Sequence, residues 1–172
     1  GGVRISMLCG RRALLDYRNR LKDGIRLSNL LSARLQLVPE AVEKLKNDCQ
    51  DREMLIGRLY GQLFGLKAGQ YPKSNRPLTL FEEGLNMVQI RQLCTLLYEQ
   101  EKGSVVMVCS GNEAQGEYQY ALGSSLMDMR ALSKAMNGKL HGRGGGSSLM
   151  AQGTFRASRQ SVMDVFQEET KS

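Results

Sequence analysis

The chain has few of the side chains from which catalytic and metal sites are built. Its 172 residues include one histidine, His141, and four cysteines, no two of which lie within four residues of each other: Cys9, Cys49, Cys94 and Cys109. Zinc sites usually contain a close-spaced pair of such ligands, so we expect no metal site. We expect instead reduced, largely buried thiols in a cytoplasmic protein. No Ser–His or Cys–His arrangement surrounds the one histidine, so we expect no covalent chemistry from these residues.

Aromatic side chains and long apolar runs are also scarce. Tryptophan is absent and aromatics make up 6% of the residues, so platforms for base stacking are few. No run approaches the roughly 18 apolar residues that a membrane helix needs. The chain opens on Gly1-Gly2-Val3 without a charged-then-apolar leader, and we therefore expect a piece of a longer protein that is not secreted.

Positive charge is in excess. The formal net charge is +7 and the pI is about 9.4, which fits a polyanionic partner but also ordinary solubility. Several cations lie close together just after the first ten residues. We expect them to form either the solvated face of a helix or an extension of an RNA contact. These residues are Arg11, Arg12, Arg18, Arg20, Lys22 and Arg26.

The first 68 residues have mainly helical periodicity. Residues 3–9 alternate in polarity at first and then turn apolar, which predicts a strand that ends at residue 10. Apolar residues at spacings of three and four predict a helix from Arg11 to about Arg34, and Pro39 opens a second helix that runs to about Lys67. The second helix carries a heptad seam from Val38 to Leu66. We predict a coiled-coil-like helical hairpin over residues 11–68, which either packs on itself or makes a homodimer.

The remaining residues predict an α/β domain with a mixed sheet over 78–172, after a linker at 68–77. Strands are expected over 78–81, 104–109, 118–123 and 149–155, the middle two forming a hairpin. Helices are expected over 87–101, over 129–137 between a cap at Asp128 and a stop at Gly138, and from about Ser158.

A glycine run, Gly142 to Gly153, is the main candidate site. Three consecutive glycines permit positive φ and a close approach to backbone N–H groups, and Arg143 adds a planar set of donors suited to phosphate. We predict a phosphate-binding loop; the alternative is a flexible surface loop. The predicted nucleic-acid-binding residues are Lys139, Arg143, Gly144, Gly145, Gly146, Ser147, Ser148, Gln152, Gly153 and Arg156.

Two segments resemble a known family. The stretch from Gly138 to Gly153 resembles the glycine-rich signature of the C-terminal domain of alanyl-tRNA synthetases. The same domain is associated with DHH phosphoesterases and ends long-form alanyl-tRNA editing proteins of the AlaX type. The opening, Gly2–Ile5 with Cys9–Leu14 and Tyr17, resembles the end of the AlaX editing domain. The resemblance covers essentially the whole chain.

The resemblance implies a tRNA-binding module, with alanine tRNA as partner. An upstream editing domain, absent from these residues, would hold the zinc and deacylate mischarged tRNA, so no cofactor is expected here. Ser147 stands where the phosphoesterase branch has histidine, which favours the tRNA branch. Two alternatives stay open: a dimerisation or structural module, and the substrate-holding domain of a DHH-type phosphodiesterase.

Overall fold

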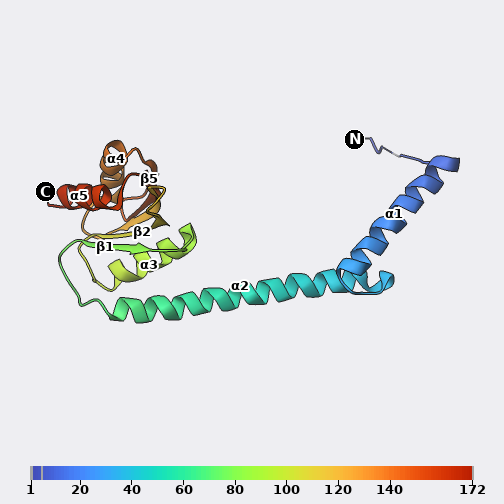
Figure 1. The fold of residues 1–172 in the computed structure, drawn as a ribbon, viewed down its shortest axis with the longest axis horizontal. Coiled ribbons are helices and arrows are strands. Elements are labelled where there is room, and N and C mark those ends of the chain that lie inside the picture. Colours follow the sequence, from blue (N-terminus) through green and yellow to red (C-terminus); the bar gives the residue numbers. More distant parts are fainter. Residues whose placement is uncertain (1, 5, 172) are drawn as a thin grey trace. The chain divides into compact units, whose positions relative to one another are not determined.

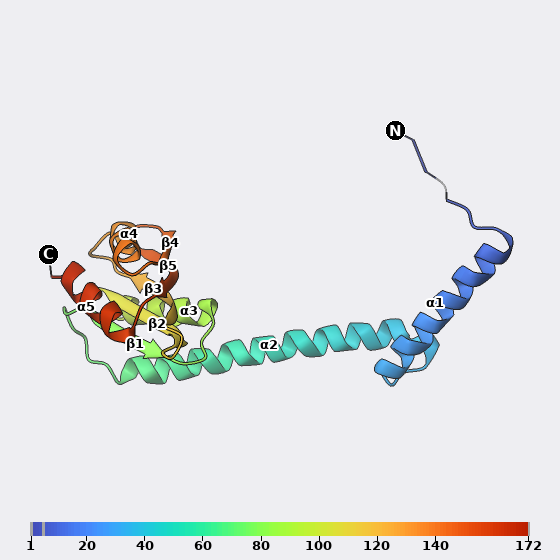
Figure 2. The same cartoon turned by 45° about the horizontal axis from the view of Figure 1, so that its top comes forward.

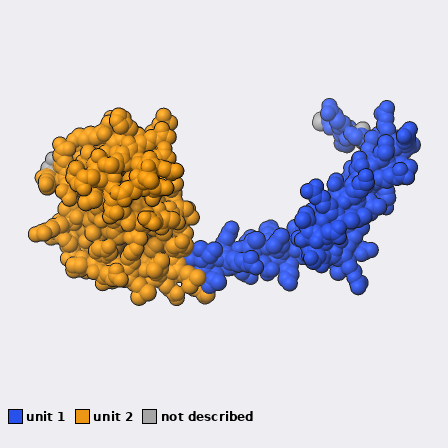
Figure 3. Space-filling view, viewed as in Figure 1, with its two compact units in different colours: residues 1–57 blue, residues 58–172 orange. Residues whose placement is uncertain are grey.

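The computed structural model describes residues 2–4 and 6–171. These residues form two compact units, 1–57 and 58–172 (Figure 3). Of the helices in the described ranges, none combines the length and the apolar character needed to cross a bilayer.

The first unit is helical (Figure 1). Helix α1 spans Gly10–Leu30 and ends before Ser32, whose φ of 50° turns the chain. A 3-10 turn, η1, spans Leu35–Leu37, and α2 then runs over Val38–Gly69. Pro39 lies in the first turn of α2, as predicted, where a missing N–H leaves no helical bond unmade.

The strand predicted over residues 3–9 is wrong. The described residues of this segment, 3–4 and 6–9, have no regular structure, and Ile5 lies outside the described residues. A strand needs a partner for its N–H and C=O groups, and all pairings of the described residues join strands of the second unit. Alternating polarity without a partner strand therefore produced no sheet here.

The apolar side chains of α1 and of the first turns of α2 are exposed, so the described chain itself does not cover them. In α1 no residue is buried. The exposed apolar residues include Leu14, Leu21, Ile25, Val42, Leu45 and Ile56. A helical N-terminal region is thus confirmed, whereas the packed hairpin and the coiled coil stay predictions.

The second unit is built on a five-stranded mixed sheet of order β1-β2-β3-β5-β4 (Figure 2). Strands β1 and β2 pair in parallel, and the other neighbours are antiparallel. The predicted α/β class with a mixed sheet is confirmed. The elements in chain order are β1 (Leu78–Glu82), α3 (Met87–Glu99), β2 (Val106–Asn112), β3 (Glu117–Gly123), α4 (Met129–Lys139), β4 (Arg143–Gly146), β5 (Met150–Arg156) and α5 (Arg159–Glu169).

Side-chain caps define the starts of the three helices in this sheet unit. The Asn86 side chain accepts from the backbone N–H of Gln89 at 3.0 Å, and the Gln89 side chain accepts from the N–H of Asn86 at 2.9 Å, which makes a capping box. Asp128 caps α4 and Ser158 caps α5, both as predicted. The predicted stop at Gly138 is wrong: α4 continues to Lys139, and His141 takes the positive φ of the following turn.

Helices cover both faces of the sheet. One apolar cluster joins α3 to the sheet and includes Phe64 and Ala68 from the end of α2. The other joins α4 and α5 to the opposite face around Tyr120 and Phe155. Because Phe64 and Ala68 are buried in this unit, the end of α2 belongs to it from residue 58, earlier than the start at 78 that the sequence predicts.

The glycine run forms a strand and not a loop, which corrects the prediction. Gly144, Gly145 and Gly146 lie in β4, and the described glycines with positive φ are elsewhere, at Gly10, Gly84 and Gly116. The reason for small residues is close approach of the backbone. A β-carbon on Gly144 would lie 2.7 Å from the Cα of Gly153 and 2.7 Å from the Tyr120 hydroxyl, closer than real contacts allow.

We expect the glycines of this strand pair to differ in their tolerance of a methyl group. Gly144→Ala should lower the free energy of unfolding by about 1–3 kcal/mol, because the β-carbon overpacks against β5 and Tyr120. Gly145→Ala is the matched control, since nothing lies within 4 Å of a β-carbon there, and it should change stability by less than about 0.5 kcal/mol. Urea unfolding measures both. Equal stability of the two variants would contradict the close approach.

Candidate nucleic-acid interface

Strand β4 is an edge of the sheet, and in the part of the chain that the structure describes it pairs with β5 alone. Ser147 N–H donates to the Met150 carbonyl at 2.8 Å, which sets the alternation of the antiparallel ladder. In such a ladder every second residue forms hydrogen bonds with the neighbouring strand. Arg143 and Gly145 therefore form backbone hydrogen bonds with β5, while the N–H and C=O groups of Gly144 and Gly146 point away from it. The edge therefore presents backbone donors to solvent.

A groove lies between this edge and helix α4. Its volume is about 480 Å³, and α4 supplies one wall from residues spaced i, i+3, i+4 and i+7. We call it the α4–β4 groove; it is lined by Arg130, Ser133, Lys134, Asn137, Gly142, Arg143, Gly144 and Gly145. Figure 2 shows α4 and β4 side by side.

The α4–β4 groove is positively charged. Arg130, Lys134 and Arg143 are exposed, and within residues 2–4 and 6–171 none of them forms an ion pair with a carboxylate. Arg130 Nε donates to the outward carbonyl of Gly146 at 3.2 Å, which holds its guanidinium at the edge of β4. Three cations beside outward N–H groups are suited to an anion with several oxygens, such as phosphate.

A buried polar cluster supports the floor of the groove. The Tyr120 hydroxyl lies 2.7 Å from Ser133 Oγ and donates to Asn137 Oδ1 at 3.1 Å. The Tyr120 ring stacks on Phe155 with centroids 3.9 Å apart. Burial raises the pKa of Tyr120 more than its hydrogen bonds to Ser133 and Asn137 lower it, so the phenol stays neutral. The cluster therefore positions α4 against the sheet and adds no charge to the groove.

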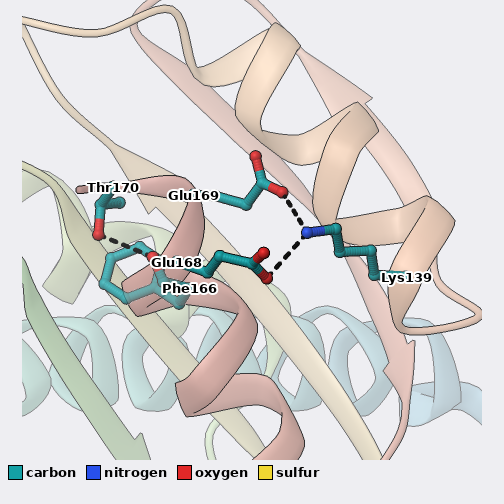
Figure 4. Close-up of polar contacts among 5 residues, drawn as sticks. All are labelled: Lys139, Phe166, Glu168, Glu169 and Thr170. Atoms are coloured by element: carbon teal, nitrogen blue, oxygen red, sulfur yellow. Dashed lines mark hydrogen bonds and ion pairs between the residues drawn. The ribbon is translucent and has the colours of Figure 1, made fainter. Parts of the chain in front are cut away.

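Two of the predicted site residues are neutralised by acidic neighbours. Lys139 Nζ lies 2.9 Å from carboxylate oxygens of both Glu168 and Glu169, as Figure 4 shows, and hydrogen bonding to them raises the pKa of Lys139. Arg156 Nε lies 3.2 Å from a Glu117 oxygen. Neither residue lines the α4–β4 groove. The α4–β4 groove thus brings Arg143, Gly144 and Gly145 together with Arg130 and Lys134, whereas Lys139, at the end of α4, and Arg156 lie outside it.

The two serines of the run form the turn between β4 and β5. Ser147 Oγ accepts from the N–H of Met150 at 3.2 Å, and the Ser148 carbonyl accepts from the N–H of Met129 at 2.9 Å. The Ser147 N–H is likewise bonded inside the chain. Ser147 and Ser148 therefore tie the turn to its neighbours, with the N-terminus of α4 held on the Ser148 carbonyl.

The opposite side of β4 has a second, smaller hollow. It measures about 240 Å³ and is lined by Arg91, Gly145, Gly146, Ser147, Met150 and Gln152. The Oε1 atom of Gln152 is buried and has no hydrogen-bond partner among the described residues. Gln152 and Gly146 thus line a different hollow from Arg143. Gly153 packs closely against Gly144 and Tyr120, which leaves no room there for a ligand.

A larger hollow, of about 640 Å³, lies at the end of the β2–β3 hairpin. Its lining is mainly neutral, and its one cation, Arg156, is paired with Glu117. Size alone therefore does not make it a better phosphate site than the α4–β4 groove, where the cations have no acidic partner.

Sequence reasoning missed Arg91, Arg130 and Lys134. Arg130 and Lys134 carried a usable signal, because an i, i+4 basic pair on a capped helix just before a glycine run lies on one face of that helix. Arg91 carried none: only the sheet topology brings α3 close to β4 and β5.

Comparison with known proteins concerns the fold. No protein-family model matches the chain, and no curated protein matches its sequence. Two solved structures are similar. The C-Ala domain from Aquifex aeolicus alanyl-tRNA synthetase matches with a TM-score of 0.50 at 19% identity, over 59% of this chain and 99% of that one. The exonuclease RecJ bound to manganese matches with a TM-score of 0.50 at 15% identity, over 83% of this chain and 33% of RecJ.

The chain shares its fold with the C-Ala domain. Identities this low show the fold alone. The two structural matches agree with a C-terminal domain of that kind. The chain spans about a third of the length of RecJ.

Two tyrosines of β3 offer a test of the polar cluster below the groove. Tyr120→Phe should lower the free energy of unfolding by about 1–2 kcal/mol, because Ser133 and Asn137 lose a buried partner. Tyr118→Phe should be neutral or stabilising, since the Tyr118 hydroxyl is buried without a partner among the described residues. Thermal unfolding of both variants decides the matter: a larger loss for Tyr118→Phe would contradict the assigned roles.

Proposed function

We propose that the α/β unit is a tRNA-binding module that holds phosphates in the α4–β4 groove. The observation that carries the proposal is the set of three exposed cations without acidic partners, Arg130, Lys134 and Arg143, beside the outward N–H groups of Gly144 and Gly146. Phosphate oxygens accept from Arg, Lys and backbone N–H groups in most protein–nucleic acid contacts. The groove offers all three kinds of donor.

The groove is suited to the backbone of a folded RNA rather than to its bases. The lining of the groove holds no aromatic residue, and Tyr120, beneath its floor, is fully buried and stacked on Phe155. Recognition would therefore depend on phosphate position and helix shape, without stacking of unpaired bases. Such binding is driven by counterion release and weakens as salt increases.

We further propose that the RNA is alanine tRNA and that the parent protein edits it. The glycine-rich signature resembles that of alanyl-tRNA synthetases and AlaX-type editing proteins, and the shared fold with the C-Ala domain supports this direction. In this proposal an upstream domain removes the wrong amino acid in the cytoplasm and holds the zinc for that reaction. Within residues 2–4 and 6–171 no group of His, Cys, Asp or Glu could hold a metal ion.

The second candidate function is substrate holding for a DHH-type phosphodiesterase. It is favoured by the match to RecJ, which extends over more of this chain than the match to the C-Ala domain does. In that case single-stranded nucleic acid would be the preferred ligand. Ser147, which replaces the histidine of the phosphoesterase signature, favours the tRNA function instead.

We expect the double variant Arg130→Gln/Arg143→Gln to bind tRNA more weakly than the wild type. Two lost phosphate contacts should reduce the slope of log affinity against log salt by roughly 1.5. Fluorescence titration of an alanine-tRNA transcript at several salt concentrations measures affinity and slope together. The same titration with single-stranded DNA separates the two candidate functions.

The matched control is Lys139→Gln/Arg156→Gln, which removes the same charge from residues already paired with acids. It should keep the wild-type slope. Equal losses in both double variants would show that net charge, and not the groove, attracts the RNA. Stronger binding to single-stranded DNA than to tRNA would favour the phosphodiesterase alternative.

We also propose that α2 makes a homodimer. Its heptad seam includes exposed apolar residues on one helix face: Val42, Leu45, Ile56, Leu59 and Leu63. Sustained apolar positions at this spacing pair with another helix in a coiled coil. The described chain covers none of these side chains fully, so a second copy is the partner that the seam fits.

Ile56→Asp should therefore dissociate the dimer, because a carboxylate in the seam is buried without a partner. Sedimentation at micromolar concentration measures the change from dimer to a 19.1 kDa monomer. Met54→Asp is the matched control: Met54 is exposed and lies on the other side of the helix, so this variant should stay dimeric. A monomeric wild type would refute the dimer.

A further inference from the structure

The chain's positive charge is concentrated away from the glycine run. Residues 58–171 contain thirteen Lys and Arg against ten Asp and Glu, so the α/β unit has a positive excess of only three. Residues 2–36 contain eight Lys and Arg against two acids, Asp16 and Asp23. The largest positive excess, six charges, thus lies on α1 and the residues that flank it.

The basic residues of α1 are ordered along one face. With about 3.6 residues per turn, four of them fall within an arc of roughly 80°. These four form what we call the basic stripe: Arg11, Arg18, Lys22 and Arg26. All four are exposed, and in the part of the chain that the structure describes none of them is ion-paired. Along the helix axis the stripe extends about 22 Å, at 1.5 Å per residue.

The acidic residues of α1 lie on a different face. Asp16 and Asp23 are about 100° around the helix from the centre of the stripe. Asp16 forms an ion pair with Arg20, whose Nε lies 2.6 Å from the Asp16 carboxylate. The stripe therefore keeps its full charge, while Arg20 does not contribute to it.

Four apolar residues of α1 form a stripe beside the basic one, while the exposed Leu15 lies within the arc of the basic stripe. Leu14, Tyr17, Leu21 and Ile25 occupy an arc of their own and are exposed. The basic stripe borders one side of this arc. Beyond the other side lies Arg20, which is paired with Asp16. The basic stripe can therefore contact a partner while the apolar stripe stays free for another helix.

We propose that the basic stripe of α1 is a second phosphate-contact surface for the RNA, independent of the α4–β4 groove. The inference rests on the proposed function, which supplies the polyanion. Three of the four cations are arginines, whose planar donors can bind two phosphate oxygens at once. Because residues 2–36 carry twice the positive excess of the α/β unit, the stripe supplies most of the long-range attraction, and the groove supplies local contacts.

The test compares two double variants of the full 172-residue chain. Arg18→Gln/Lys22→Gln removes two charges from the basic stripe, and Arg12→Gln/Arg20→Gln removes two from other positions on the same helix. Glutamine keeps helix propensity, and circular dichroism checks that α1 stays formed. The stripe variant should lower affinity for an alanine-tRNA transcript roughly tenfold or more near 0.1 M salt and reduce the salt slope by about 1.5. The control should keep the wild-type slope.

Several outcomes would overturn the inference. Equal slopes for the two variants would show that position on the helix does not matter. Loss of binding to phosphatidylserine vesicles with unchanged tRNA binding would make the stripe a lipid contact. Loss in the groove variant Arg130→Gln/Arg143→Gln but not in the stripe variant would leave the proposed function intact and remove the stripe from it. A wild type that binds no tRNA at low salt would refute both.

Discussion

The close approach of β4 to β5 over the ring of Tyr120 is the constraint on which the candidate interface depends. Gly144 and Gly153 face each other across the ladder, and a β-carbon on either would collide with the opposite backbone and with Tyr120. The approach places an edge strand directly beside α4, and the Tyr120–Ser133–Asn137 hydrogen bonds hold that helix in place. The groove and its cations follow from this one contact.

Much of the α/β unit could be predicted from the sequence, because its signals are local. Asp128 and Ser158 mark the starts of two helices because their side chains cap the first backbone N–H groups. The apolar run at 104–109 is typical of a buried strand. The glycine run was wrongly predicted to be a loop because its structure depends on residues far from it in the sequence. Glycine favours loops by local preference, and only the pairing with β5 and the space required by Tyr120 make it a strand.

The site residues show the same division. Arg143 was found because it adjoins the glycines. Arg130 and Lys134 were missed, although their i, i+4 spacing places them on one face of α4. Only the structure shows that this face lines the groove beside β4. Lys139 and Arg156 were selected for their charge, but that charge is balanced by Glu168, Glu169 and Glu117, which are distant or inconspicuous in the sequence. Counting cations near a motif does not reveal which of them are already paired.

The exposed edge of β4 has a consequence for the behaviour of the protein in solution. An unpaired edge strand is a template for pairing with another extended chain, and flat edges of this kind promote aggregation. Here the edge is only four residues long and carries little side-chain surface, while Arg130, Lys134 and Arg143 surround it with like charge. Two copies of this edge therefore repel each other, and the cations that attract a polyanion also oppose the pairing of one β4 edge with another.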